Sequence, residues 1–315
     1  ITCVAENYST TRLLTNEKPS IENKHEDKFK RIHRRIAFEE SNGCIYIDVD
    51  NKNIRKIGPS KHRIVPTSKA KFIKDNNIIP MAEPDTENSD LELLHKYIHV
   101  PNDVFKVLLV AILNSFFDNT PHVLIAITGE GGAAKSTIQK FLKMIMDPSS
   151  AALNPMFKTD KDLVAAALHS HVIDINNVSK IKDDMQDLMC VILTGGTYTC
   201  RALYTNNGQS AVNLHNPMIM NGIGDSADRD DLLQRTVYVP LKKIGKGVRK
   251  TEGDVMATFD KDLPVIMAGL FDTLSDILHI QESFETDENL NRMADFHKLG
   301  LMTEEALGWK KGSFT

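Results

Sequence analysis

The segment "IAITGEGGAAKST", Ile125–Thr137, passes from an apolar run into a glycine-rich loop. The preceding residues extend the apolar run to the length of a buried parallel strand. The following segment, "KSTIQKFLKMIM", has apolar residues at a helical spacing. The loop matches the pattern GxxxxGK[ST] except at Ala134, where the pattern has its second glycine. Strand, loop and helix in this order predict a phosphate-binding loop.

This loop has the composition that nucleotide phosphates require. Successive backbone N–H groups and the helix dipole favour the phosphates, Lys135 supplies a cation, and the Ser136 hydroxyl can coordinate Mg²⁺. An ordinary glycine-rich turn is the alternative, and the flanking strand and helix argue against it. We therefore expect ATP and Mg²⁺ as cofactors. The residues expected to bind the nucleotide are Gly129, Glu130, Gly131, Gly132, Ala133, Ala134, Lys135, Ser136 and Thr137.

The charge of the whole chain does not indicate a nucleic-acid-binding protein, because the net charge over 315 residues is −4. Lys and Arg outnumber Asp and Glu between Lys24 and Lys74, so this part either meets an anionic partner or is a solvated surface. The cysteines have no zinc spacing. The most apolar segment, "VFKVLLVAILNSFF", is too short for a membrane span. We expect a cytoplasmic protein with no membrane partner.

The chain divides into three predicted parts. Residues 1–85 are expected to form an arm and a small basic α+β domain, with "FKRIHRRIAF" as a short helix and "GCIYIDVD" as a strand. Residues 86–242 alternate strands with helices, which predicts an α/β core. Residues 243–315 have only helical patterns and are expected to form a lid.

Polar residues follow two further strands of the predicted core. In "HVIDINN", Asp174 can coordinate Mg²⁺, and Asn176 lies on the same face of the strand. Asn221, at the end of "PMIMNGI", can orient an attacking water. Arg229 and Arg235 lie on the next short helix, and an arginine from a neighbouring subunit can stabilise a transferring phosphoryl group. The structural alternatives are a polar strand end, a turn asparagine and solvated arginines.

Residues from about 90 to 300 resemble the AAA+ ATPase modules of phage and mobile-element replication proteins. These modules are superfamily 3-like or minichromosome-maintenance-like helicases, often fused to a primase-polymerase. The resemblance is carried by "GEGGAAKST", "LTGGTYTCRALYTNNGQ", "NPMIMNGIGD", "DRDDLLQRTVYVPL" and "NRMADFHKLG". It implies an AAA+ P-loop ATPase core with a C-terminal helical lid.

The resemblance also implies roles for individual residues. Lys135 and Ser136 would be the Walker A residues, and Ser136 and Asp174 would hold the metal. Asn221 would be the first sensor, and Arg235 the arginine finger, with Arg229 as the second choice. The residues with an implied catalytic role are Lys135, Asp174, Asn176, Asn221, Arg235 and Arg229.

A β-hairpin is predicted where two alternating stretches flank Asn207-Gly208. By the resemblance, this hairpin projects into a central pore and touches single-stranded DNA. The residues implied to contact DNA are Arg201, Tyr204, Asn206, Asn207 and His215.

Two positions depart from the family pattern. Minichromosome-maintenance-type loops also carry alanine before the lysine, so Ala134 is compatible with that group. In relatives an acid is expected at the position of Asn176. Either Asp174 serves instead, which we expect, or the site binds ATP and hydrolyses it poorly.

These observations predict an ATP-driven DNA helicase or translocase that forms a ring, expected to be a hexamer, and acts on single-stranded or forked DNA. A primase-polymerase, fused or associated, is a further expected partner. The host is expected to be bacterial or archaeal, with the protein in its cytoplasm. The alternative function is an ATP-binding replication initiator or loader with little hydrolysis. The predicted hairpin argues against a third possibility, an AAA+ remodeller of proteins.

Overall fold

The computed structural model describes residues 32–314 apart from 67, 69, 152, 202–208, 223–226, 244, 246, 248–249 and 286–289. Its centre is a five-stranded parallel sheet with the strand order β13-β7-β12-β9-β8. The strands are β7 (Leu124–Thr128), β8 (Asn154–Pro155), β9 (Ile173–Val178), β12 (Met218–Gly222) and β13 (Thr236–Pro240).

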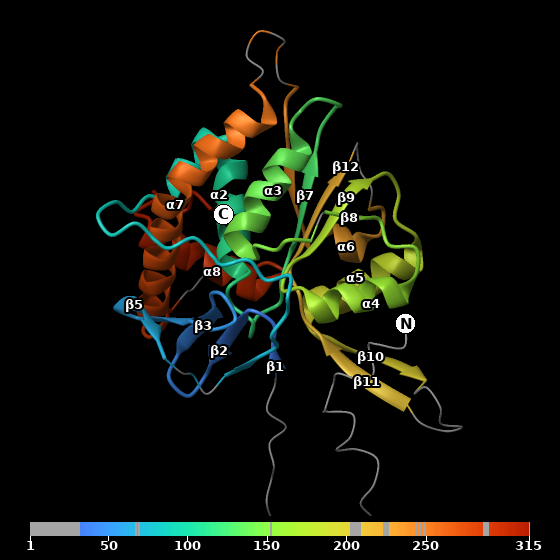
Figure 1. The fold of residues 1–315 in the computed structure, drawn as a ribbon, viewed down its shortest axis with the longest axis horizontal. Helices are drawn as coiled ribbons and strands as arrows, with labels where there is room; N and C mark the ends of the chain where they lie inside the picture. The colour runs from blue at the N-terminus through green and yellow to red at the C-terminus, as the bar shows by residue number, and fades with distance from the viewer. Residues whose placement is uncertain are drawn as a thin grey trace, which may run out of the picture. The chain divides into compact units, whose positions relative to one another are not determined.

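Helices cover both faces of this sheet (Figure 1). One face packs against α2 (Asn102–Asn114), α3 (Lys135–Met146), α7 (Glu252–Gln281) and α8 (Ala294–Ala306). The other face packs against α4 (Asp160–His169), α5 (Asp183–Thr194) and α6 (Asp230–Leu233). Because both faces are buried, strand β7 is almost entirely apolar, as its sequence indicated. The predicted α/β class and the helical C-terminal part are confirmed.

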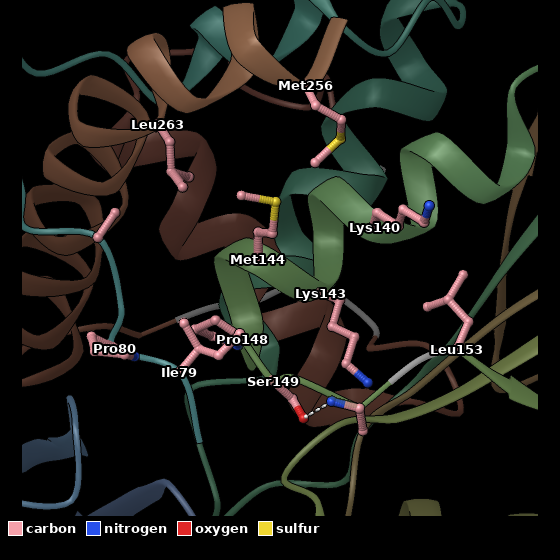
Figure 2. A pocket seen from close by; sticks show the side chains of 12 residues that line it. Ile79, Pro80, Lys140, Lys143, Met144, Pro148, Ser149, Leu153, Met256 and Leu263 are labelled. Atoms are coloured by element: carbon pink, nitrogen blue, oxygen red, sulfur yellow. Dashed lines mark hydrogen bonds between the residues drawn. The ribbon is translucent and has the colours of Figure 1, made fainter. Parts of the chain in front are cut away.

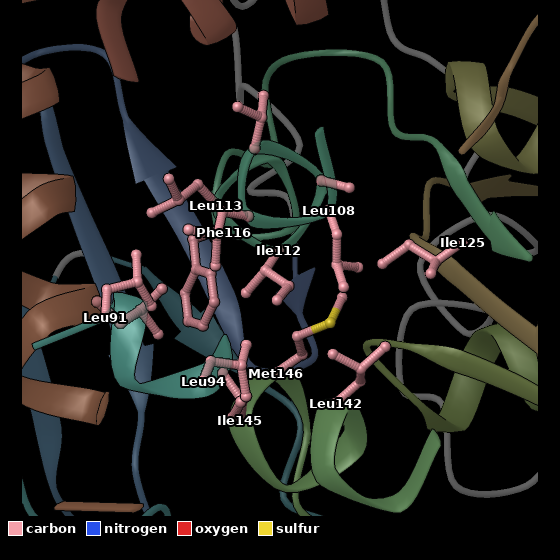
Figure 3. Close-up of a cluster of buried hydrophobic side chains, with 14 of the residues drawn as sticks. Leu91, Leu94, Leu108, Ile112, Leu113, Phe116, Ile125, Leu142, Ile145 and Met146 are labelled. Carbon is pink, nitrogen blue, oxygen red and sulfur yellow. The ribbon is translucent and has the colours of Figure 1, made fainter. Parts of the chain in front are cut away.

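The larger hydrophobic cluster joins the P-loop helix to the helices around it. Figure 3 shows side chains of α2 and α3 meeting, with Leu91 and Leu94 beside them and Ile125 of β7 nearby. Leu94 belongs to the short 3₁₀ helix η2 (Glu92–Lys96). The α2 and α3 residues labelled there are Leu108, Ile112, Leu113, Leu142, Ile145 and Met146.

Among the described helices, α7 is long and apolar enough to cross a membrane, judged by length and composition alone. However, 67% of its most apolar 18-residue window is buried inside the structure, as in the core helix of a globular protein.

The N-terminal part is a four-stranded antiparallel sheet in the order β2-β3-β4-β5. Its strands are β2 (Ile36–Glu39), β3 (Cys44–Asp48), β4 (Ile54–Gly58) and β5 (Lys61–Val65), and β1 (Ile32–His33) pairs separately with β6 (Lys71–Phe72). The helix expected in "FKRIHRRIAF" is wrong for its described residues, which include strand β2. Ile36 and Ala37 are buried on opposite faces of that strand, which an amphipathic helix would not require.

Residues 32–315 form one compact unit. The larger hydrophobic cluster includes Ile45 and Ile57 of the N-terminal sheet, Leu109 of α2 and Phe271 of α7. The predicted domain boundaries at residues 85 and 242 therefore fall inside this unit.

Candidate functional site

The glycine-rich loop connects the end of β7 to the start of α3, at the carboxyl edge of the parallel sheet. Gly129 has φ +148°, and a Cβ atom there would lie 2.6 Å from the Leu241 carbonyl oxygen. Lys135 Nζ donates hydrogen bonds to the carbonyl oxygens of Gly129, at 2.6 Å, and Glu130, at 3.0 Å. The loop therefore has the close backbone packing and the cation of a phosphate-binding site.

The backbone conformation of Ala134 shows why the GxxxxGK[ST] pattern has glycine at this position. Its backbone is left-handed, with φ 61° and ψ 24°, immediately before the first residue of α3. A residue with a Cβ atom adopts this conformation at a cost of about 1–2 kcal/mol. The loop therefore keeps the backbone conformation that the pattern requires, and Ala134 carries strain that a glycine would not.

We expect Ala134→Gly to raise the free energy of unfolding by about 1 kcal/mol, because glycine removes most of this backbone strain. The greater conformational entropy of glycine in the unfolded chain offsets only part of that gain. The matched control is Ala133→Gly, which shortens a buried side chain whose φ is not positive and should destabilise the protein. Urea denaturation of both variants measures the difference. Equal destabilisation by the two variants would contradict the role of strain at Ala134.

A network of amide and hydroxyl groups connects the loop to the neighbouring strands. Ser136 Oγ donates to Asn176 Oδ1 at 3.2 Å, and Asn221 Nδ2 donates to the same oxygen at 2.6 Å. Asn221 Nδ2 also contacts Gln139 Oε1, and its Oδ1 accepts from the Asn177 backbone N–H at 2.9 Å. The structure therefore brings together the predicted residues Ser136, Asn176 and Asn221. Sequence reasoning missed Gln139, a fully buried polar residue of the amphipathic helix α3, whose signal in the sequence is its place beside the apolar residue Ile138.

Asp174 lies in different surroundings from Asn176. It is fully buried and forms an ion pair with Lys143 Nζ. Its Oδ2 accepts the Asn154 backbone N–H at 3.1 Å, and its Oδ1 lies 3.4 Å from Asn154 Nδ2. Lys143 is eight residues beyond Lys135, which is about 12 Å along α3. The expected role of Asp174 as the metal-side acid does not fit this arrangement, because both carboxylate oxygens have partners and Asn176 is the residue beside Ser136.

Of the two candidate finger arginines, Arg235 lies at the edge of the sheet opposite the loop of its own chain. The Arg235 carbonyl accepts from the Leu124 backbone N–H at 2.9 Å, so Arg235 sits where β7 begins. The length of β7, about 16 Å, separates that edge from the glycine-rich loop. Arg235 Nη1 donates to the Asp231 carbonyl at 2.6 Å, and Arg229 Nε lies 3.1 Å from Asp187 Oδ1.

The predicted hairpin is confirmed by the antiparallel strands β10 (Gly196–Arg201) and β11 (Gln209–Leu214). It extends from the edge of the sheet opposite the glycine-rich loop (Figure 1). Tyr204, Asn206 and Asn207 lie outside the described residues, as does the side chain of Arg201.

His215, for which a DNA contact is predicted, is half-buried against residues of its own chain. Its ring lies 4.4 Å from that of buried His122, and its Nδ1 is 3.1 Å from the Asp118 carbonyl oxygen. His215 is therefore packed at the base of the hairpin. Asn216 beside it is fully buried and donates to the carbonyl oxygens of Ala167, Ser170 and His171, which fixes the hairpin to the end of α4.

A groove of about 410 Å³ lies between α3, α7 and the segment around Ile79 (Figure 2). Its lining is mostly apolar, and Lys140 and Lys143 are its charged residues. No residue of the glycine-rich loop lines it, so the groove is separate from that loop.

The fold and the glycine-rich loop together define an α/β P-loop ATPase core. The chain belongs to the family of actinomycete integrative conjugative element replication proteins, whose model matches residues 92–312. No curated protein matches the sequence.

Distant structural neighbours include the C-terminal region of NrS-1, with 13% identity, a TM-score of 0.44, and coverage of 71% of this chain and 65% of that one. A second structure of that region (305–718) has 11% identity, a TM-score of 0.43, and coverage of 69% and 58%. JCV helicase has 13% identity, a TM-score of 0.30, and coverage of 67% and 62%. This chain therefore spans less than two thirds of each of these structures.

Proposed function

We propose that this chain is the ATP-binding module of a mobile-element replication protein and that ATP acts mainly as an assembly switch, as in a replication initiator or loader. The observation that carries this proposal is the amide at the metal side of the site. Asn176 contacts Ser136, while the carboxylate of Asp174 is paired with Lys143. An asparagine brings no negative charge to Mg²⁺ and cannot accept a proton from water.

The residues present fit MgATP binding. At Gly129 the loop backbone lies so close to the Leu241 carbonyl oxygen that a side chain would not fit. Lys135 supplies the positive charge. The Ser136 hydroxyl and the Asn176 carbonyl oxygen lie 3.2 Å apart and are the groups that would hold Mg²⁺. The bound metal would neutralise phosphate charge. Asn221 would hold Asn176 in position, since its amide already bonds to that side chain.

The second candidate is the ring-forming helicase or translocase, and two observations favour it. Hairpin β10–β11 extends from the sheet, as expected for an element that meets single-stranded or forked DNA in a pore. Arg229 precedes α6, and Arg235 follows it at the edge of the sheet away from its own loop, so that either could meet the phosphates of a neighbouring copy in a hexamer. Both candidates act in the host cytoplasm, with a fused or associated primase-polymerase as a compatible partner.

An ATPase assay with and without single-stranded DNA tests the proposal. Wild-type turnover should be slow and weakly stimulated, and Asn176→Asp should raise it by about tenfold or more, which corresponds to ~1.4 kcal/mol of activation free energy. The added charge would strengthen Mg²⁺ coordination beside Ser136.

The matched control is Asn177→Asp, which adds the same charge at the next, exposed position and should change turnover less. Lys135→Ala supplies the background rate of a site without its cation. Fast, DNA-stimulated turnover by the wild type would reject the assembly-switch proposal and favour the helicase.

A further inference from the structure

One face of the N-terminal sheet packs against α7, and the opposite face carries a small hydrophobic cluster around Tyr46 with cations of β4 and β5 beside it. On the face toward α7, Ile57 is buried, and the Arg55 guanidinium and the His62 ring lie 5.1 and 5.4 Å from the ring of Phe271 in α7. Side chains alternate along a strand, so Lys56, Lys61 and Arg63 project from the opposite face.

The strand register places these cations close together. Lys56 of β4 is directly opposite Arg63 of β5, and Lys61 is opposite Gly58. Directly opposed residues have Cβ atoms about 5 Å apart, and alternate residues along one strand are about 7 Å apart. Lys61 and Arg63 are exposed and Lys56 is half-buried. The three side chains therefore form one basic patch, here called the β4–β5 basic face.

Within the described part of the chain, no carboxylate lies within ion-pair distance of these three cations. The acid nearest in register, Asp48 of β3, is buried and accepts the Asn51 backbone N–H at 2.7 Å. The charge of the β4–β5 basic face is thus available to an external polyanion.

We propose that the β4–β5 basic face binds the phosphate backbone of duplex DNA. Single-strand binding relies on exposed aromatic side chains that stack on bases. The aromatic residue beside this patch, Tyr46, is only 8% exposed, and Lys56 Nζ lies 5.8 Å from its ring. Cations without a stacking platform suit sequence-independent phosphate contacts on a duplex.

The sheet is also tied to the base of the hairpin. Asp118 Oδ2 lies 2.7 Å from His33 Nδ1 in β1, and its Oδ1 accepts the Phe38 backbone N–H of β2 at 2.7 Å. The Asp118 carbonyl is the same group that contacts His215 after β11. A duplex on the β4–β5 basic face would therefore lie on the body that carries the hairpin. This inference depends on the proposed function only in taking DNA as the partner.

Fluorescence anisotropy with a 5′-labelled duplex of about 25 base pairs, in a salt series without nucleotide, tests the inference. Each lost phosphate contact reduces the log-log salt slope by about 0.9 for duplex DNA, so Lys56→Gln/Lys61→Gln/Arg63→Gln should reduce it by up to about 2.7. The control, Lys158→Gln/Lys161→Gln/Lys180→Gln, makes the same charge change at exposed sites near α4 and β9 and should keep the wild-type slope.

Three results would overturn the inference: no duplex binding by the wild type, equal slopes for the two triple variants, or a loss confined to a single-stranded probe of the same length. Thermal melts check that both triple variants are folded. ATP binding is measured separately on the same proteins, so failure of the β4–β5 basic face is distinguishable from failure of the nucleotide site.

Discussion

Replacing Asp174 with asparagine is expected to lower the free energy of unfolding by about 3–5 kcal/mol, because it leaves the Lys143 ammonium buried without its counter-charge. Binding of MgATP should change little under conditions where the variant is folded, since Asn176 is the residue that contacts Ser136. Urea denaturation measures the first effect, and titration calorimetry with a non-hydrolysable ATP analogue measures the second.

The control combines Asp174→Asn with Lys143→Met. Methionine removes the unpaired charge and fills similar space, and the amide oxygen introduced on β9 would still accept the Asn154 backbone N–H, so most of the lost stability should return. A magnesium ligand at Asp174 would behave differently. Asp174→Asn would then abolish Mg²⁺-dependent nucleotide binding at little cost in stability, and that result would restore the metal-side role expected from the sequence.

The distinction between Asp174 and Asn176 shows where prediction from the sequence stops. Strand periodicity correctly places both on one face of β9, because alternate residues share a face. Their chemistry differs because α3 crosses that face, with Ser136 above Asn176 and Lys143 above Asp174. The crossing of α3 depends on packing between elements far apart in the chain, which periodicity does not contain.

Local signals predict much of the fold. The apolar run before Gly129 and the Asn207-Gly208 pair each specify an element through neighbouring residues alone, and β7 and the β10–β11 hairpin are present. The packing of His215 has no local signal, because its partners, His122 and Asp118, are 93 and 97 residues away. A histidine at the end of a strand looks the same in sequence whether it is solvated or packed.

The helix expected in the N-terminal part is wrong, and distant partners are again the reason. "FKRIHRRIAF" has the charges of an exposed helix, yet Arg35 is 1% exposed. Its Nε lies 2.8 Å from Asp147 Oδ1, and its Nη2 donates to the Pro148 carbonyl at 2.9 Å. Both partners follow the P-loop helix α3, more than a hundred residues later. The basic character of this segment is therefore partly structural.

Arg35→Met is expected to destabilise the protein by about 3–5 kcal/mol, because Asp147 would remain as a buried, unpaired charge. Asp147 Oδ2 accepts the backbone N–H groups of His171 and Val172, at 2.9 and 3.0 Å, but these bonds supply no full charge. Burial lowers the pKa of His171 to about 4, so its ring is neutral at pH 7 and cannot replace Arg35.

Arg63→Met is the matched control for Arg35→Met, because it removes an exposed arginine from the same sheet and should change stability by less than about 0.5 kcal/mol. Urea denaturation followed by tryptophan fluorescence and by circular dichroism measures both variants. Asp147 ends α3 and bonds to the residues that lead into β9, so Arg35 links the N-terminal sheet to both elements of the nucleotide site. If Arg35→Met costs no more than Arg63→Met, that link is not energetically significant. A large loss within one cooperative transition would mean that the β4–β5 basic face and the ATP site belong to one folding unit.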